Sequence, residues 1–420
     1  MKIALIIEHF DPARGGAEQY TFWLAEQLTQ RGHEVHVVCH DSARWRHKYQ
    51  AAHQGASHDA QKSANAGKSS IITAPDGVQV HRLPAIKLST GIGFRQFGLA
   101  ARNWCREQQP DVTHSMTAAY PGDLYHPHAG VYARMQEQSI AARESGREAA
   151  LKRWLLRLSG KQRTLLSLER QAAQAAAGEQ PWKILCLSST MIADFQTIYG
   201  VAKQRLTLLE NPIMTPPPDI DRIKQDRHWF REAYGLSETD RVAVFVGHDF
   251  RRKGLAWAIR AVAESQSSWR LVVAGLGKVK DYVALTRRLG VAERVKFIGP
   301  TRATGAVYSA ADVLLLPTFY DSFGLVALEA LAYGLPVIST RFLGCATYIE
   351  KNKLGIIVDS PRKFAAMAAA LDMIELQFPD RKGLIWRARA AGQALLPASH
   401  LDKLESLYAH YRKVMPSNRG

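Results

Sequence analysis

The sequence is poor in cysteine and contains no long apolar segment. Its 420 residues include only four cysteines, and no two of them form a C-x-x-C pair, which argues against a disulfide scaffold and against a zinc site. No window approaches the ~20 apolar residues of a membrane-spanning helix. The apolar run at the start is too short for the core of a secretory signal. We therefore expect a cytoplasmic chain that is soluble or at most peripheral on a membrane.

Acidic residues are outnumbered by basic ones. Lys and Arg total 55 against 38 Asp and Glu, so the formal net charge at pH 7 is +17. This charge favours anionic partners such as phosphates, an acidic membrane surface or nucleic acid. The basic and aromatic motifs of nucleic-acid recognition are missing, so no nucleic-acid partner is expected.

The first half of the chain alternates between strand and helix patterns. An apolar run at residues 2–7 precedes a loop with Gly15-Gly16, a helical pattern at about 18–30 and a strand at 34–39. This βαβ unit predicts a parallel, doubly wound sheet, with further strands at residues 78–83, 112–114, 124–126 and 184–188. The small polar residues 51–70 are expected to form a flexible surface insertion.

A second series of strands and helices follows the proline-rich residues 211–218, which we interpret as an interdomain linker. Strands are expected at 242–246, 270–274, 295–298, 313–316, 336–339 and 355–358, and helices at 255–264, 305–310 and 324–332. We predict an α/β chain of two Rossmann-like doubly wound parallel-sheet domains, residues 1–208 and 209–398. A C-terminal helix within 399–420 is expected to return to the first domain. Ligands bind such domains at the carboxyl ends of the strands, so the cleft between the domains is the expected site.

The strongest motif covers residues 318–338. A buried strand pattern ends there, a polar loop follows, and a helix begins near Phe323-Gly324-Leu325, whose amides form an anion site. Glu329 lies roughly 9 Å further along the helix axis, near the span of a diphosphate plus ribose. Alternatively, Asp321 and Glu329 are solvated residues beside a packed helix. The apolar surroundings of Glu329 weigh against this, because a carboxylate there needs a partner.

Two glycine-containing loops offer further phosphate contacts. Between a strand and a helix, the loop from Gly247 to Gly254 carries Arg252 and Lys253, two cations that can neutralise a diphosphate without metal. Gly15 and Gly16 allow close approach of the backbone to a phosphate or sugar and tolerate positive φ. Alternatively, the loop from Gly247 to Gly254 is a basic loop that only adds solubility, and the Gly15-Gly16 loop is a plain turn.

Two histidines follow the strand predicted at 124–126. His126 and His128 suit a cleft-edge loop that orients a hydroxyl or a leaving phosphate. The H-x-H spacing also suits a metal pair, but no third ligand of convincing spacing stands near, so no metal is expected. We favour His128 over His126 as a catalytic residue, with Asp123 as a further candidate.

Residues 318–338 resemble the signature of the family-4 retaining glycosyltransferases of GT-B fold, Glu-x7-Glu followed by A-x-G-x-P-V-I. Here Asp321 stands at the first acid and Glu329 at the second. The resemblance implies that Glu329 binds the ribose of a nucleotide-sugar donor and that Asp321 binds its sugar hydroxyls. The aspartate is one methylene shorter than the usual glutamate.

The same resemblance assigns roles to the other motifs. It implies that Arg252 and Lys253 clamp the donor diphosphate and that the Gly15-Gly16 loop faces the donor across the cleft. It also implies a cleft histidine near His128. The first domain would then bind the acceptor and the second the nucleotide sugar, with no cofactor and no metal.

One branch of the family shares more of the sequence. The segments at 156–158, 168–170, 191–196, 246–254 and 344–349 resemble glucosyltransferases that act on a heptose of the lipopolysaccharide inner core. This resemblance implies UDP-glucose as donor and a lipid-linked saccharide as acceptor. The alternative is a mannosyl- or galactosyl-transferase of the same family that acts on another cell-envelope polysaccharide or glycolipid.

Residues 143–170 are basic and amphipathic. Eight Lys and Arg against three Glu give this segment a net charge of +5, and leucines and Trp154 are interleaved with them. Such a stretch can lie on an anionic membrane surface, which predicts a peripheral protein on the inner face of the cytoplasmic membrane. Alternatively, its leucines pack on their own domain and its cations are solvated.

Overall fold

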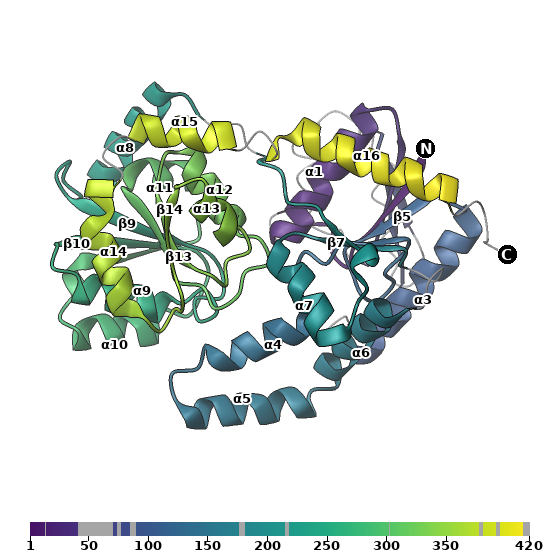
Figure 1. Cartoon of the computed structure of the whole chain (residues 1–420), viewed down its shortest axis with the longest axis horizontal. Coiled ribbons are helices and arrows are strands. Elements are labelled where there is room, and N and C mark those ends of the chain that lie inside the picture. Colours follow the sequence, from purple (N-terminus) through teal and green to yellow (C-terminus); the bar gives the residue numbers. More distant parts are fainter. Residues whose placement is uncertain are drawn as a thin grey trace. The chain divides into compact units, whose positions relative to one another are not determined.

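A computed structural model describes residues 1–12, 14–40, 70–73, 77–84, 90–175, 181–214, 218–301, 303–377, 381–391 and 395–414. Residues 51–69 of the predicted insertion and 215–217 of the predicted linker lie outside them. The chain forms two compact units (Figure 1). Unit 1 comprises Met1–Arg134, Leu151–Asn211 and His400–Gly420, and unit 2 comprises Met135–Ala150 and Pro212–Ser399.

Unit 1 is built on a sheet whose strand order, within the described residues, is β3-β4-β2-β1-β5-β6-β7-β8. The strands are β1 (Lys2–Ile6), β2 (Glu34–Cys39), β3 (Ser70–Thr73), β4 (Gln79–Arg82), β5 (Val112–Ser115), β6 (Leu124–Tyr125), β7 (Lys183–Cys186) and β8 (Leu206–Leu208). The edge strand β3 is antiparallel to β4, whereas the other neighbouring strands are parallel. β1 reads as a continuous apolar run because it is almost wholly buried in the middle of the sheet.

The helices of unit 1 include the last one of the chain. They are α1 (Gly16–Gln30), α3 (Gly91–Gln108), α4 (Tyr132–Ala141), α5 (Gly146–Leu158), α6 (Gly160–Gln174), α7 (Ser189–Tyr199) and α16 (Pro397–Val414), of which α4, α5 and α16 include residues of unit 2. The Tyr408 hydroxyl of α16 lies 2.6 Å from Nδ1 of His114 in β5, and Tyr411 is hydrogen-bonded to the Asp123 carboxylate. These buried contacts fasten α16 to the carboxyl-terminal part of β5 and to the start of β6.

Unit 2 contains a second sheet, with the order β11-β10-β9-β12-β13-β14 in the described residues and parallel pairing throughout. The strands are β9 (Arg241–Val246), β10 (Trp269–Ala274), β11 (Val295–Gly299), β12 (Val313–Leu316), β13 (Val337–Thr340) and β14 (Gly355–Val358). The helices are α8 (Ile220–Ala233), α9 (Leu255–Glu264), α10 (Lys280–Arg288), α11 (Thr304–Ala310), α12 (Leu325–Ala332), α13 (Ala346–Lys351), α14 (Phe364–Gln377) and α15 (Arg381–Ala391). The predicted class, two Rossmann-like parallel-sheet domains, is confirmed.

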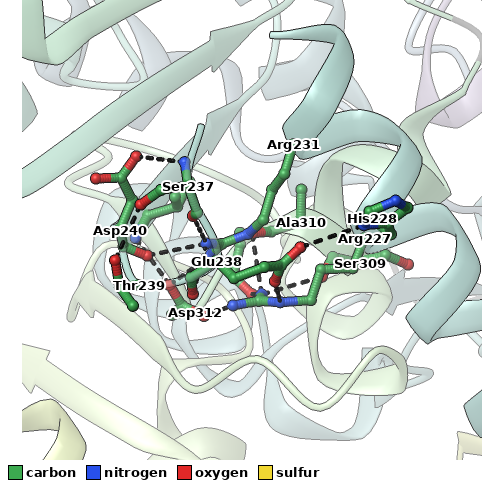
Figure 2. Close-up of polar contacts among 12 residues, drawn as sticks. Arg227, His228, Arg231, Ser237, Glu238, Thr239, Asp240, Ser309, Ala310 and Asp312 are labelled. Atoms are coloured by element: carbon green, nitrogen blue, oxygen red, sulfur yellow. Dashed lines mark hydrogen bonds and ion pairs between the residues drawn. The ribbon is translucent and has the colours of Figure 1, made fainter. Parts of the chain in front are cut away.

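A buried guanidinium fastens α8 to the sheet of unit 2 (Figure 2). Arg231 is fully buried, and its Nη2 donates to the Asp312 carboxylate at 3.1 Å. Its other donors reach the carbonyl oxygens of Ala310, Ser237, Glu238 and Asp240 at 2.5–3.2 Å. Asp312 also accepts from the amide of Val242 in β9 at 2.8 Å. The charge of Arg231 is therefore matched by acceptors from several segments.

Candidate functional site

Two loops at the carboxyl ends of β9 and β12 form the centre of the candidate site. β9 and β12 are neighbours in the sheet of unit 2. The amide of Phe319 donates to the carbonyl of Arg252 at 2.8 Å. Gly254 has φ of 83°, and a Cβ there would lie 1.9 Å from the carbonyl oxygen of Pro317. Only glycine fits this close approach, which brings the basic loop onto the loop that carries Asp321.

Lys253 and Asp321 form an ion pair at this junction. The Nζ atom of Lys253 donates to Oδ2 of Asp321, and Lys253 is only 8% exposed. Burial works to raise the pKa of Asp321, but the attraction of Lys253 and of Arg252, with hydrogen bonds from Lys253 and the Phe323 amide, together outweigh burial, so the pKa of Asp321 lies below its ordinary value. Burial lowers the pKa of Lys253, and the attraction of Asp321 opposes that shift. The structure thus brings together Lys253, which was predicted to bind the donor diphosphate, and Asp321, which was predicted to bind the sugar hydroxyls.

Arg252 is also engaged with protein acceptors. Its Nη1 donates to the carbonyl of Tyr320 at 2.7 Å, and its Nε lies 3.1 Å from the carboxylate of Asp249. Gly247 directly follows β9 and has φ of 154°, and a Cβ there would lie 3.5 Å from Cγ of Lys253. The basic loop thus follows the carboxyl end of β9, and Arg252 fastens it to the loop after β12.

The start of α12 lies directly beyond Asp321. Gly324 caps this helix with φ of 99°, and a Cβ there would lie 2.4 Å from Cδ1 of Leu343. The backbone of Asp321 is held against the segment after β13, by bonds to Phe342 at 3.0 Å and Gly344 at 2.9 Å. Because the first amides of a helix have no partners within it, the Phe323-Gly324-Leu325 turn presents backbone donors next to Asp321, and the Phe323 amide lies 3.4 Å from Oδ1 of that carboxylate.

Glu329 of α12 has a buried partner that the sequence analysis did not identify. The hydroxyl of Tyr308 in α11 donates to Oε2 of Glu329 at 2.8 Å, and Tyr308 is 1% exposed. Burial raises the pKa of Glu329 above its ordinary value, and the bond from Tyr308 opposes that shift. The only signal in the sequence was that a carboxylate within an apolar helix needs a partner.

The Gly15-Gly16 loop lies at the start of α1 in unit 1. Gly15 caps the helix with an extended backbone, φ of −177°, a conformation open to any residue. Gly16 is not among the residues with positive φ. The tolerance of positive φ that we expected from these glycines is therefore not used. A Cβ on Gly15 would lie 3.1 Å from a carboxylate oxygen of Glu18, the end of a flexible side chain, so this contact does not require glycine either.

His126 and His128 are both buried in unit 1 among aromatic rings. His128 packs against Tyr20 at 4.2 Å between ring centroids and against His126 at 4.3 Å. Burial lowers the pKa of both histidines well below the ordinary value, which leaves the rings neutral. The Asp123 carboxylate accepts from the amide and hydroxyl of Thr113 at 2.8 and 2.7 Å, and Tyr411 also bonds to it. Asp123 is thus a buried structural carboxylate.

Among the described residues, no group of three or more His, Cys, Asp or Glu side chains is placed to hold a metal ion. In the same part of the chain, no helix is both long enough and apolar enough to span a bilayer.

Two family models match most of the sequence. Residues 14–215 match the model described as Glycosyltransferase Family 4, and residues 226–391 match the one described as Glycosyl transferases group 1. The chain belongs to the family-4 glycosyltransferases. The predicted resemblance is thereby confirmed, and the loops around Lys253, Asp321 and Glu329 lie within the second matched range.

Curated relatives of this chain include glycosyltransferases with different names. It is 32% identical over 214 residues to the lipopolysaccharide glucosyltransferase WaaG of Escherichia coli, an alignment that covers 50% of this chain and 56% of the relative. It is 33% identical over 190 residues to a D-inositol 3-phosphate glycosyltransferase of Corynebacterium diphtheriae, an alignment that covers 42% of this chain and 44% of the relative. The chain thus spans about half the length of the curated relatives it matches.

Solved structures of glycosyltransferases share the fold. The crystal structure of WaaG, a glycosyltransferase involved in lipopolysaccharide biosynthesis, has a TM-score of 0.67 at 24% identity and covers 99% of this chain and 100% of its own. The crystal structure of Anabaena HepE in complex with UDP-glucose has a TM-score of 0.68 at 15% identity, and the match covers 98% of this chain and 100% of HepE. These likenesses confirm the predicted GT-B fold class.

Proposed function

We propose that this glycosyltransferase moves a hexose from a nucleoside diphosphate to a saccharide hydroxyl with retention and without a metal. The observation that carries the proposal is the placement of Arg252 and Lys253 in a loop that packs on the segment leading into α12. Ammonium, guanidinium and helix-start amides are the donors that hold phosphate oxygens. Glu329, further along the same helix, accepts hydrogen bonds from the ribose.

The proposed chemistry needs no side-chain nucleophile. The acceptor oxygen forms a bond to the anomeric carbon while the bond to the departing diphosphate breaks, and a phosphate oxygen takes the acceptor proton. Lys253, Arg252 and the Phe323-Gly324-Leu325 amides stabilise the negative charge that develops on the diphosphate. In this proposal Asp321 binds the hydroxyls of the transferred sugar, Gly15-Gly16 approaches the donor, and neutral His128 orients a hydroxyl.

We propose UDP-glucose as the donor and a lipid-linked saccharide, such as the heptose of the lipopolysaccharide inner core, as the acceptor. WaaG, a relative, is a lipopolysaccharide glucosyltransferase, and HepE, which shares the fold, has been crystallised with UDP-glucose. Thermal-shift screening of UDP-glucose, UDP-galactose and GDP-mannose, followed by transfer assays with the bound donor, tests the choice. Transfer to D-inositol 3-phosphate, the acceptor class in the name of another relative, would replace the proposed acceptor.

The exposed helix α5 supports a membrane-associated acceptor. No residue of α5 is buried, and Leu151, Trp154, Leu155 and Leu158 are 49–57% exposed. By contrast, Leu165 and Leu168 of α6 are buried, so the α6 part of residues 143–170 packs on its own unit. We propose that α5, with its basic residues Lys152, Arg153 and Arg157, places the enzyme on the inner face of the cytoplasmic membrane.

Liposome flotation tests this surface. The variant K152E/R153E/R157E should lose binding to anionic vesicles, whereas R287E/R288E, which reverses two exposed cations of α10, should retain most of it. Equal partitioning of wild type and the α5 variant onto anionic vesicles would contradict membrane docking through α5. Equal losses in both variants would point to the net charge of the protein instead.

A further inference from the structure

The two cations of the donor site in unit 2 are each paired with a carboxylate. The ammonium group of Lys253 bonds to Oδ2 of Asp321. The other oxygen, Oδ1, lies 3.4 Å from the amide of Phe323 at the start of α12. One carboxylate therefore contacts both a cation and a helix-start amide, the two kinds of donor that the proposed function gives to a phosphate.

A phosphate and this carboxylate compete for the same donors. Both are anions that accept charge-assisted hydrogen bonds from an ammonium group and from amides at a helix start. Two anions on one buried ammonium repel each other. Lys253 is almost fully buried, so there is little water to screen that repulsion. A diphosphate that reaches Lys253 must therefore displace Asp321.

We infer that the donor binds by exchanging ion pairs: its diphosphate takes Lys253 from Asp321, and the released carboxylate accepts hydrogen bonds from the hydroxyls of the transferred sugar. This inference rests on the proposed function and gives Asp321 a second role. A nucleotide sugar offers hydroxyl groups to the released carboxylate, whereas the nucleoside diphosphate product offers none in that position. Asp321 thus favours the complete donor over the product and helps the product to leave.

Asp249 provides a matched control for the charge of Asp321. It pairs with the other cation of the site, at 3.1 Å from Nε of Arg252, but its side chain is 55% exposed. Solvent screens such a pair, so its removal changes anion binding little. Asp249 also has φ of 54°, a conformation that asparagine tolerates well, so Asp249→Asn is expected to fold.

Calorimetric titration of UDP and of UDP-glucose into wild type, D321N and D249N tests the exchange. D321N should bind UDP about tenfold tighter than wild type, because no carboxylate competes for Lys253. Its preference for UDP-glucose over UDP should fall by a similar factor, since an amide replaces the carboxylate that receives the sugar hydroxyls. D249N should change the UDP affinity by about threefold at most.

Two outcomes would overturn the exchange: D321N binding UDP no tighter than wild type, and D249N tightening UDP as much as D321N does. Wild type that binds neither UDP nor UDP-glucose would instead overturn the proposed function. If thermal unfolding shows that D321N is not folded, D321E serves in its place. D321E keeps the negative charge, so its affinity for UDP should lie within about threefold of the wild-type affinity. Binding of UDP by D321E about tenfold tighter than by wild type would also overturn the exchange.

Discussion

Replacement of Tyr308 by phenylalanine tests whether a buried hydroxyl holds Glu329 in its ionised form. The hydroxyl of Tyr308 donates to Glu329 at 2.8 Å, and phenylalanine keeps the ring in place. A hydrogen bond to a charged group contributes about 1.5–3 kcal/mol, so Y308F should lose about 2 kcal/mol of unfolding free energy at pH 7.5. For a unit of this size, that loss corresponds to about 4–8 °C in Tm.

The pH dependence separates this explanation from a general loss of packing. Burial raises the pKa of Glu329 and the Tyr308 hydroxyl lowers it, so the variant should have a still higher pKa at Glu329. The hydroxyl favours the ionised carboxylate, so its contribution to stability is largest above the pKa of Glu329 and diminishes as pH falls. Thermal unfolding and UDP titration between pH 5 and 7.5 measure both effects. A difference in stability below about 0.5 kcal/mol at pH 7.5, or one independent of pH, would refute the reasoning.

Three further predictions concern the two units. Lys253→Ala and Glu329→Ala should each abolish sugar transfer while far-ultraviolet circular dichroism stays unchanged, and near-normal turnover of either purified variant would contradict the proposed site. Arg231→Leu leaves the Asp312 carboxylate without its buried partner and should lower the free energy of unfolding by about 3–5 kcal/mol in denaturant titration. Arg227 also contacts Asp312, at 3.0 Å, and a loss under about 1 kcal/mol would show that Arg227 alone is sufficient to pair with this carboxylate. Burial raises the pKa of Glu169 to about 7, so the carboxyl group of Glu169 binds its proton more tightly in the folded state than in the unfolded state. The resulting stabilisation is complete below about pH 4.5 and is lost as pH rises to 7. Glu169→Gln cannot titrate and should flatten the fall of Tm between pH 5 and 7, and parallel Tm curves would argue against a raised pKa.

The central strands of both sheets were predictable because they are buried on both faces. β12 begins and ends at the predicted residues, and β9 differs by one residue at its start. Such strands appear in the sequence as uninterrupted apolar runs between glycines or polar loops. β3 was not predicted, and its first residue, Ser70, had been assigned to the flexible insertion at 51–70, whereas within the described residues Ser70–Thr73 pairs with β4 at the edge of the sheet. The sequence before this strand is polar and has no apolar period.

The residues of the candidate site that belong to short sequence motifs were predictable from the sequence. Arg252, Lys253, Asp321 and Glu329 stand in two short loops and one helix, and the parallel sheet brings the carboxyl ends of their strands together. The direct bond between Lys253 and Asp321 depends on how two loops pack, which residue spacing does not encode. The same applies to Tyr308, whose link to Glu329 joins two helices across 21 residues of sequence.

The return of α16 to the first unit has a practical consequence for dividing the chain. A fragment that stops at Asn211 would remove the hydroxyl beside His114, the Tyr411 bond to Asp123 and the His400 ring, which lies 2.8 Å from the Tyr20 hydroxyl. Each loss leaves a polar atom in an apolar interior without the group that satisfied it. An isolated first unit should therefore include residues 397–414, supplied through a linker or as a separate peptide, and a circular permutation that joins this helix ahead of Met1 offers a single-chain way to do so.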